Sequence, residues 1–172
     1  GTGQPLLYVV GGFAPPLGIA LRADGISAMM MLTASLIAAA AAAFAWRDDG
    51  APADSRERRS SLVFLSSLLA IGSALNLLFI SADLFNLYVG LELLTFAAIP
   101  IVSLKGSAET LRAALRYLLF AVFGSMLYLL GIVLIYGAYG TLDIAMLASR
   151  VRPDGVTLLA AGLATAGLVA KT

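Results

Sequence analysis

The sequence has 172 residues, of which 60% are hydrophobic and 12% charged, whereas a soluble domain carries roughly 25% charged residues, so an ordinary soluble domain is excluded. The net charge of +1 excludes a nucleic-acid partner of the usual kind, because no basic face is available to neutralise phosphates. Cysteine and histidine are both absent, which excludes disulfides, the usual zinc sites and haem or iron–sulfur ligation within these residues, and we expect neither a cofactor nor a metal site.

The first segment, residues 1–22, contains three prolines and five glycines in a mildly apolar setting. Proline removes a backbone donor and glycine permits positive φ, so a spanning helix is disfavoured. We expect an extracytoplasmic loop or short hairpin here. Because the chain begins at Gly1 rather than Met and ends at Thr172 after an apolar run, we also expect it to be an excerpt of a longer protein.

The remainder, residues 23–172, is expected to form one transmembrane helical domain, because its apolar runs are long enough to cross roughly 30 Å of hydrocarbon. Asp24 is suited to be the N-cap of the first span, and Trp46 lies where an aromatic belt residue is expected. Polar connections are predicted at 47–59 and 140–154. The expected fold is all-α, a polytopic bundle of about five spanning helices at about 24–46, 60–82, 84–104, 108–137 and 155–172, the last of them truncated.

Lysine and arginine predict the orientation, because basic residues are enriched in cytoplasmic connections. Seven basic residues fall on one side of the predicted spans and three on the other. The side with seven is therefore predicted to be cytoplasmic. Its members are Arg47, Arg56, Arg58, Arg59, Lys105, Arg112 and Arg116, and the opposite side holds Arg22, Arg150 and Arg152.

Glu92 is the acidic residue that the spans should not tolerate without a reason. It lies about nine residues into the third span, roughly 13 Å deep at 1.5 Å per residue. A charge at the centre of a spanning helix costs on the order of 2.5–3.5 kcal/mol. Burial favours the neutral carboxyl and a nearby cation favours the carboxylate, a competition suited to a proton carrier. The alternative is a glutamate held statically by hydrogen bonds to neighbouring helices.

Other polar residues in the spans have simpler interpretations. Lys171 follows an apolar run and, from the pattern alone, is expected to extend toward the interface, with a mid-membrane titratable lysine as the alternative. Arg112 and Arg116 share a helix face and fit positive-inside flanking, and Glu109 is placed to pair with Arg112. We expect Asp83 and Asn86 to be solvated caps, Asn76 to make an interhelical hydrogen bond, and helix packing to explain Gly72, Gly124, Gly131 and the pair Gly162 and Ala166.

Several motifs together resemble one family. They are GGFAPPLGI at 11–19, DLFNLYVGLE at 83–92, LRAALRY at 111–117, YGAYGT at 136–141 and GLVAKT at 167–172. With them the sequence resembles the proton-translocating antiporter-like subunits of respiratory complex I, of membrane-bound hydrogenases and of Mrp-type cation/proton antiporters. The resemblance extends across nearly the whole chain.

This resemblance implies a longer subunit of which the chain would form helices three to six and the start of seven. It implies that Glu92 and Lys171 are a membrane-embedded pair whose separation moves protons, with Arg112, Arg116 and Asp83 in supporting positions. The implied partners are the lipid bilayer, other membrane subunits and protons, with sodium exchange as a variant, in a plasma (inner) membrane. The chain would hold no active site of its own, although its complex could be an NADH:quinone oxidoreductase or a hydrogenase.

Two other functional classes stay open at this point. One is a non-pumping anchor or assembly subunit of such a complex. The other is a secondary transporter for an organic solute, which predicts broken helices around a midplane pocket. Pro100 is the one residue that hints at a broken helix.

Overall fold

The structure, a computed structural model, describes residues 4–16, 18–49, 55–104 and 106–171, with the backbone alone at 46–49 and 55–58. The interpretations of Trp46, Arg47, Arg56, Arg58 and Lys105 therefore concern side chains outside the described part. The elements in chain order are β1 (Leu6–Val9), a 3₁₀ turn η1 (Val10–Gly12), β2 (Ala20–Ala23), α1 (Gly25–Asp49), α2 (Ser55–Ile80), α3 (Leu84–Val102), α4 (Ala108–Tyr139), α5 (Ile144–Arg150) and α6 (Gly155–Lys171).

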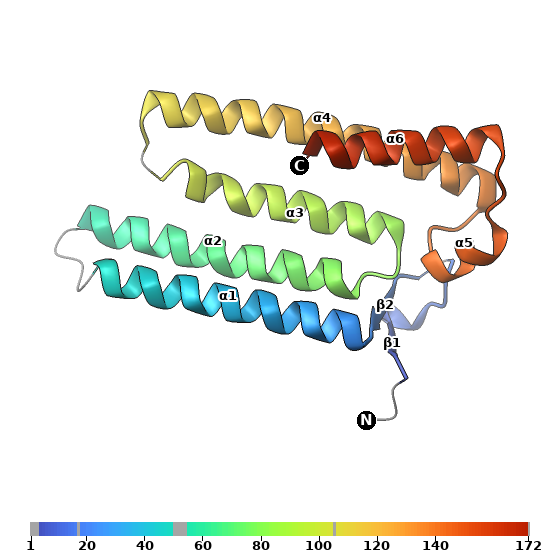
Figure 1. Cartoon of the computed structure of the whole chain (residues 1–172), viewed down its shortest axis with the longest axis horizontal. Coiled ribbons are helices and arrows are strands. Elements are labelled where there is room, and N and C mark those ends of the chain that lie inside the picture. Colours follow the sequence, from blue (N-terminus) through green and yellow to red (C-terminus); the bar gives the residue numbers. More distant parts are fainter. Residues whose placement is uncertain (1–3, 17, 50–54, 105, 172) are drawn as a thin grey trace.

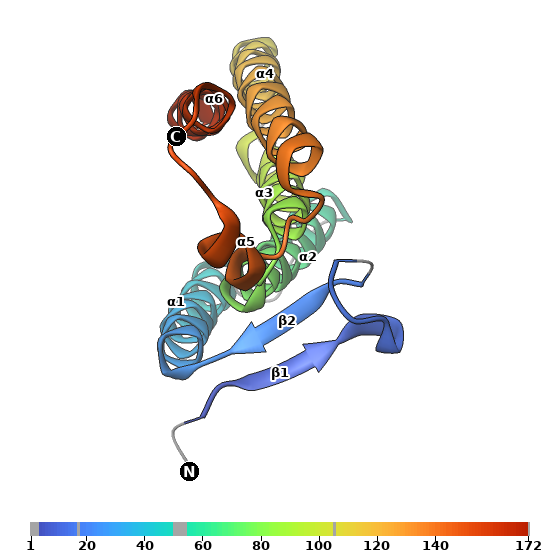
Figure 2. The same cartoon turned by 90° about the vertical axis from the view of Figure 1, so that its right-hand side faces the viewer.

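The long helices form one row in chain order. Helices α1 to α4 run alternately up and down, each packed against the next (Figure 1). Helix α6 leaves this row and packs along α4, as the view along the bundle shows (Figure 2). The hairpin β1–β2 and the short helix α5 lie together at one end of the bundle (Figure 2).

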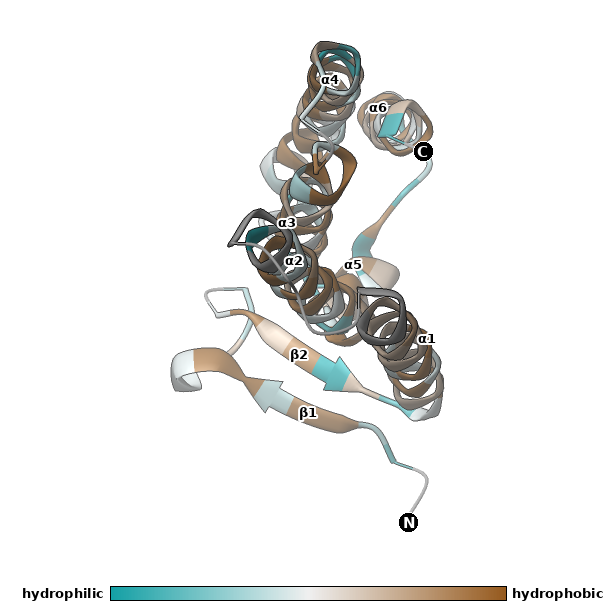
Figure 3. Cartoon of the chain, turned by 90° about the vertical axis from the view of Figure 1, so that its left-hand side faces the viewer, coloured by the Kyte–Doolittle hydropathy of each residue, from teal (hydrophilic) through white to brown (hydrophobic). Residues whose placement is uncertain are grey.

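Four of the described helices are long and apolar enough to cross a membrane: Gly25–Ala45 within α1, Arg59–Ile80 within α2, α3 and α4. Helix α6 is shorter, at 17 residues. The helices are hydrophobic along most of their length (Figure 3), and many large apolar side chains are exposed on them. Helices that are apolar on all faces suit burial in hydrocarbon. The fold is therefore a mostly helical bundle with four long apolar spans and one shorter apolar helix.

Aspartates cap four of the described helices: Asp24 before α1, Asp83 before α3, Asp143 before α5, and Asp154 before α6, where it accepts from the Thr157 backbone N–H at 2.7 Å. Asp24 accepts hydrogen bonds from the backbone N–H groups of Ser27 (3.0 Å) and Ile26 (3.1 Å), which confirms its predicted N-cap role. The hydrogen bond from the Ser27 backbone N–H contributes most to holding the pKa of the Asp24 carboxyl below its ordinary value of 3.8. Asp83 caps α3 and Asp143 caps α5 in the same manner. Each carboxylate satisfies helix donors that would otherwise lack a partner.

Two ordered elements lie outside the row of long helices. Residues 6–23 contain a two-stranded antiparallel hairpin, in which Leu6 lies opposite Ala23 and Val9 opposite Ala20. Helix α5 interrupts the predicted polar connection 140–154. Both features pair backbone groups at one end of the bundle: Ala82 N–H donates to Ala20 O at 3.3 Å, and Ile144 N–H donates to Ala82 O at 2.9 Å. Satisfying these groups explains why residues 144–150 form a helix within the predicted polar connection. The hairpin is one of the two forms expected for residues 1–22.

The interpretation of the small residues is right for two glycines and wrong for two. A Cβ at Gly124 would lie 2.7 Å from Gly167 O, and one at Gly131 would lie 2.6 Å from Ala160 O, so α4 and α6 approach closely there. A Cβ at Gly72 or Gly162 would meet nothing within 4 Å. Among the residues that the structure describes, the buried Oδ1 of Asn76 has no hydrogen-bond partner, so this oxygen does not make the expected interhelical bond there.

Candidate ion-pair site in the helix bundle

The central polar contact joins two helices that are distant in sequence. Lys171 Nζ, at the end of α6, lies 2.8 Å from Glu92 Oε1 on α3. The two side chains are 9% and 17% exposed, respectively. This is the one ion pair in the part of the chain whose side chains the structure describes. The two charged residues suggested by the sequence therefore form a single, largely buried site.

The pair lies near the middle of the bundle rather than at a rim. Glu92 is the ninth residue of the 19-residue helix α3. A Cβ at Gly124, near the middle of α4, would lie 3.3 Å from Lys171 N. The C-terminal end of α6 is accordingly seen about halfway along α4 (Figure 1). Lys171 is thus directed to a carboxylate inside the bundle, and the interpretation of an interfacial lysine is wrong for this structure.

Glycines fix the position of Lys171. Gly124 on α4 and Gly167 on α6 face each other, and a Cβ on either would lie within 2.7 Å of the carbonyl oxygen of the other. Only residues without a side chain allow two helices this approach. Gly167 is one turn before Lys171, so one of the close contacts of the helix pair lies beside the ion pair.

Ser125 is a third member of the site. Lys171 Nζ donates to Ser125 Oγ at 2.6 Å, and the Ser125 hydroxyl donates to Ala121 O at 2.9 Å. The residue is 4% exposed. A serine is common in apolar helices, where its hydroxyl bonds the preceding turn, so sequence patterns alone do not point to it. The one available indication is its position as the eighteenth residue of the 32-residue apolar helix α4.

Tyr128, on the next turn of α4, is a further buried polar residue. Its hydroxyl donates to Leu84 O in the first turn of α3, at 3.3 Å, and the residue is 6% exposed. This contact connects α4 to the N-terminal end of α3. It lies on the side of the ion pair toward the hairpin, because α3 begins and α4 ends there (Figure 1).

The remaining predicted site residues are not brought to the pair. Arg112 and Arg116 are exposed near the start of α4, and Arg116 precedes Ser125 by nine positions, roughly 13 Å along the helix. Glu109 and Arg112 do not form the expected ion pair. Asp83 acts as the N-cap of α3. Asn86 is buried rather than solvated and donates to Ser81 Oγ at 2.8 Å.

The basic residues separate between the two ends of the bundle. Arg59, Arg112 and Arg116 lie at the end where α2 and α4 begin. Arg22, Arg150 and Arg152 lie at the hairpin end, beside β2 and the connection between α5 and α6. For these six residues, whose side chains the structure describes, the grouping used to predict the orientation agrees with the fold. The assignment of the first end to the cytoplasm stays a prediction.

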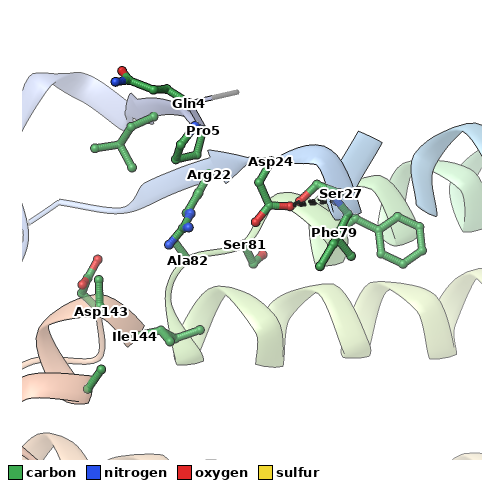
Figure 4. Close-up of a pocket in the computed structure, with 14 residues that line it drawn as sticks. Gln4, Pro5, Arg22, Asp24, Ser27, Phe79, Ser81, Ala82, Asp143 and Ile144 are labelled. Carbon is green, nitrogen blue, oxygen red and sulfur yellow. Dashed lines mark hydrogen bonds between the residues drawn. The ribbon is translucent and has the colours of Figure 1, made fainter. Parts of the chain in front are cut away.

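An open cavity of about 830 Å³ lies at the hairpin end. Arg22 extends from β2 toward the segment that holds Ala82, with Asp24 and Asp143 on the same cavity (Figure 4). The two carboxylates already act as helix caps. No group of three or more histidine, cysteine or acidic residues suited to a metal ion occurs among the described residues.

These features define a class: a polytopic helical membrane protein with a carboxylate–lysine pair inside its bundle. The chain belongs to the NADH:quinone oxidoreductase/Mrp antiporter transmembrane family, which matches residues 81–172. It is therefore a multi-pass membrane protein. The family predicted from the sequence motifs is confirmed.

Relatives in sequence and structure agree with this assignment. The chain is 36% identical over 152 residues to the protein named "Putative antiporter subunit mnhD2" of Staphylococcus aureus, in strains JH9 and Newman among others. The match covers 88% of this chain and 29% of the relative, so the chain spans about a third of the length of these relatives.

Two solved complexes contain a similar fold. One is the membrane-bound sulfane sulfur reductase, an archaeal respiratory membrane complex, with 28% identity and a TM-score of 0.74 over 98% of this chain and 34% of that one. The other is the Mrp complex from Dietzia sp. DQ12-45-1b, with 24% identity and a TM-score of 0.75 over 97% of this chain and 30% of that one. The second likeness concerns the fold alone.

Proposed function

We propose that the chain is part of an antiporter-like subunit that moves protons across a membrane, and that Glu92 and Lys171 take part in the transfer. The observation that carries this proposal is the 2.8 Å contact between Lys171 Nζ and Glu92 Oε1 inside the bundle. The family and the relatives named as antiporter subunits support the same function.

Because the Glu92–Lys171 pair is buried, a contribution to stability is a weak explanation for its presence. Moving two charges out of water costs several kcal/mol per ion, and a well-packed apolar pair is often as stable or more stable. A buried ion pair at mid-depth is therefore better explained by a use of its ionisation.

The chemistry follows from the two states of the contact. While the pair is closed, the carboxylate favours the protonated lysine. When Glu92 moves away, the ammonium remains in a low-dielectric site without its counter-charge, and the neutral amine becomes favoured. The N–H bond then breaks, the proton passes to a water molecule, and the amine retains the electron pair. Return of a proton and of the carboxylate restores the first state.

The proposed partners follow from the relatives and from the surface. One sequence relative is named an antiporter subunit, and both solved relatives belong to membrane complexes. The helices expose many large apolar side chains, which suits contact with lipid and with helices of neighbouring subunits. We propose that the transported ion is the proton. Exchange of protons against sodium is the alternative mode of transport, and it is tested in the same experiment.

The decisive experiment replaces Glu92 in the full-length protein within its assembly. Glu92→Gln removes the charge and keeps the shape, so we expect most proton flux into proteoliposomes to be lost while assembly survives. Glu109→Gln makes the same chemical change at an exposed position at the start of α4 and is expected to leave flux unchanged. Wild-type flux in Glu92→Gln would refute the proposed role.

The same experiment separates transport from anchoring. An anchor subunit would keep full flux in Glu92→Gln and would lose the complex when packing is disturbed at Gly124 or Gly167. Flux and recovery of the intact complex are therefore measured in parallel. The flux is measured with and without a sodium gradient.

A further inference from the structure

Lys171 has two partners, and the second is neither charged nor on the helix of the first. Its ammonium donates to Glu92 on α3 and to Ser125 on α4. The Ser125 contact is the shorter of the two, at 2.6 Å against 2.8 Å. Because the two partners lie on different helices, a motion of Glu92 away from Lys171 leaves the lysine beside the Ser125 hydroxyl.

The hydrogen-bond directions at Ser125 are defined by its neighbours. Its hydroxyl hydrogen is directed to Ala121 O, one turn earlier. The oxygen then presents a lone pair to the ammonium, which has three donors and no acceptor. Ser125 thus accepts from Lys171 while the lysine is protonated.

Once Lys171 is a neutral amine, its nitrogen can accept a hydrogen bond, whereas the ammonium could only donate. After the ammonium gives its proton to water, the nitrogen has a lone pair and can accept a hydrogen bond. A hydroxyl carries one donor and two acceptor sites and rotates freely, so Ser125 can turn its hydrogen from Ala121 O to Lys171 Nζ. Ala121 O keeps the ordinary helical bond from the residue four positions later, so this rotation leaves no group unsatisfied.

We infer that Ser125 is a positioning residue that holds Lys171 in place through both protonation states, as acceptor to the ammonium and as donor to the amine. This inference rests on the proposed function of the Glu92–Lys171 pair. Glu92 cannot fill the same role, because an ionised carboxylate offers acceptors only.

The surroundings of Lys171 contain few other groups that could act in this way. From α3 the titratable group in contact is Glu92. From α4 the neighbouring titratable side chain is Tyr128, whose hydroxyl is directed to Leu84 O. The charged residues of α4 are Glu109, Arg112 and Arg116, all at least nine positions before Ser125.

The test uses the full-length protein in its assembly, with proton flux into proteoliposomes measured across a range of pH. Ser125→Ala removes the hydroxyl, and we expect flux to fall on the order of tenfold, since hydrogen bonds to charged groups are the stronger ones. The pH at which flux is half-maximal should also move lower, because the lost bond to the ammonium is charge-assisted and stronger than the lost bond to the neutral amine. A role in packing alone would not move this midpoint.

Two further variants control the result. Ser125→Thr keeps a hydroxyl that can bond the preceding turn, and should restore the wild-type midpoint. Ser67→Ala makes the same change at another buried serine, on α2 and 6% exposed, and should leave flux and midpoint unchanged.

The outcomes distinguish this inference from the proposed function. If Lys171→Ala abolishes flux while Ser125→Ala behaves like Ser67→Ala, the role of Ser125 is overturned and that of the pair stands. If Lys171→Ala retains full flux, the proposed function fails, and the role of Ser125 fails with it.

Discussion

Gly124 and Gly167 bring the backbones of α4 and α6 together beside the ion pair. A Cβ at Gly124 would lie 2.7 Å from Gly167 O, and a Cβ at Gly167 would lie 2.5 Å from Gly124 O. Lys171 follows Gly167 by one helical turn, and Ser125 follows Gly124 directly. The close packing of these two glycines therefore sets the distance between Lys171 and the Ser125 hydroxyl.

Substitution of Gly167 should disturb the site without changing any charged residue. A methyl at Gly167 would approach Tyr128 N at 2.6 Å as well as Gly124 O, so Gly167→Ala must push α6 away from α4. We expect a loss of about 1–3 kcal/mol of stability, as for other overpacked sites, together with a loss of flux. The measurements are thermal unfolding of the solubilised protein and proton flux.

Gly162 supplies the matched control on the same helix. A Cβ there would meet nothing within 4 Å, so Gly162→Ala should be tolerated and should keep wild-type flux. Equal effects of the two substitutions would show that α4 and α6 do not depend on this close contact.

The sequence predicts the long helices well because hydrocarbon imposes a strict requirement. A span needs about 20 apolar residues with all backbone groups bonded internally, and this requirement is visible in composition alone. Helix α5 depends instead on hydrogen bonds between distant segments, such as Leu84 N–H to Leu142 O at 3.0 Å. No local pattern encodes such pairs.

The residues of the candidate site also differ in how well the sequence predicts them. Glu92 is evident from the sequence because a carboxylate inside an apolar run is costly. Lys171 is ambiguous, because an interfacial lysine and a buried one follow the same pattern. Ser125 is not evident, since its role depends on α6 lying against α4. Gly72 and Gly124 are equivalent as sequence features, and only the packing of the folded chain distinguishes them.

Removing both charges should cost less stability than the two single removals added together. Glu92→Gln leaves a buried ammonium and Lys171→Met a buried carboxylate, and breaking a buried pair in this way costs about 3–5 kcal/mol. The double variant leaves no unpaired charge, so its loss of stability should be smaller than the sum of the single losses. A double-mutant cycle of thermal unfolding measures this coupling. Additive losses would contradict the contact between Glu92 and Lys171.

The stability that the Asp24 N-cap gives to the start of α1 should depend on pH. Hydrogen bonds from Ser27 and Ile26 hold its pKa below 3.8. A carboxyl with a lowered pKa in the folded state stabilises that state above 3.8, and the stabilisation is lost as the pH falls through the lowered value. Asp24→Asn keeps a capping oxygen that does not titrate in this range, so its stability should depend less on acid.

Carboxyl chemical shifts measured by NMR during acid titration check this prediction. The wild-type Asp24 signal should have its midpoint below 3.8, and Asp154, whose pKa is lowered by its bond from the Thr157 backbone N–H, should behave alike. A midpoint at or above 3.8 for Asp24 would contradict the cap.

Replacement of Lys171 by arginine separates charge from proton release. Arginine keeps a cation for Glu92, so assembly and thermal stability should stay close to those of the wild type. Its guanidinium does not lose its proton in proteins, so we expect Lys171→Arg to preserve only part of the flux. Lys171→Ala, which removes the cation as well, should abolish most of the flux and also lower stability, because Glu92 is then left unpaired. Flux in Lys171→Arg equal to that of the wild type would mean that the site needs a positive charge and not a transferable proton.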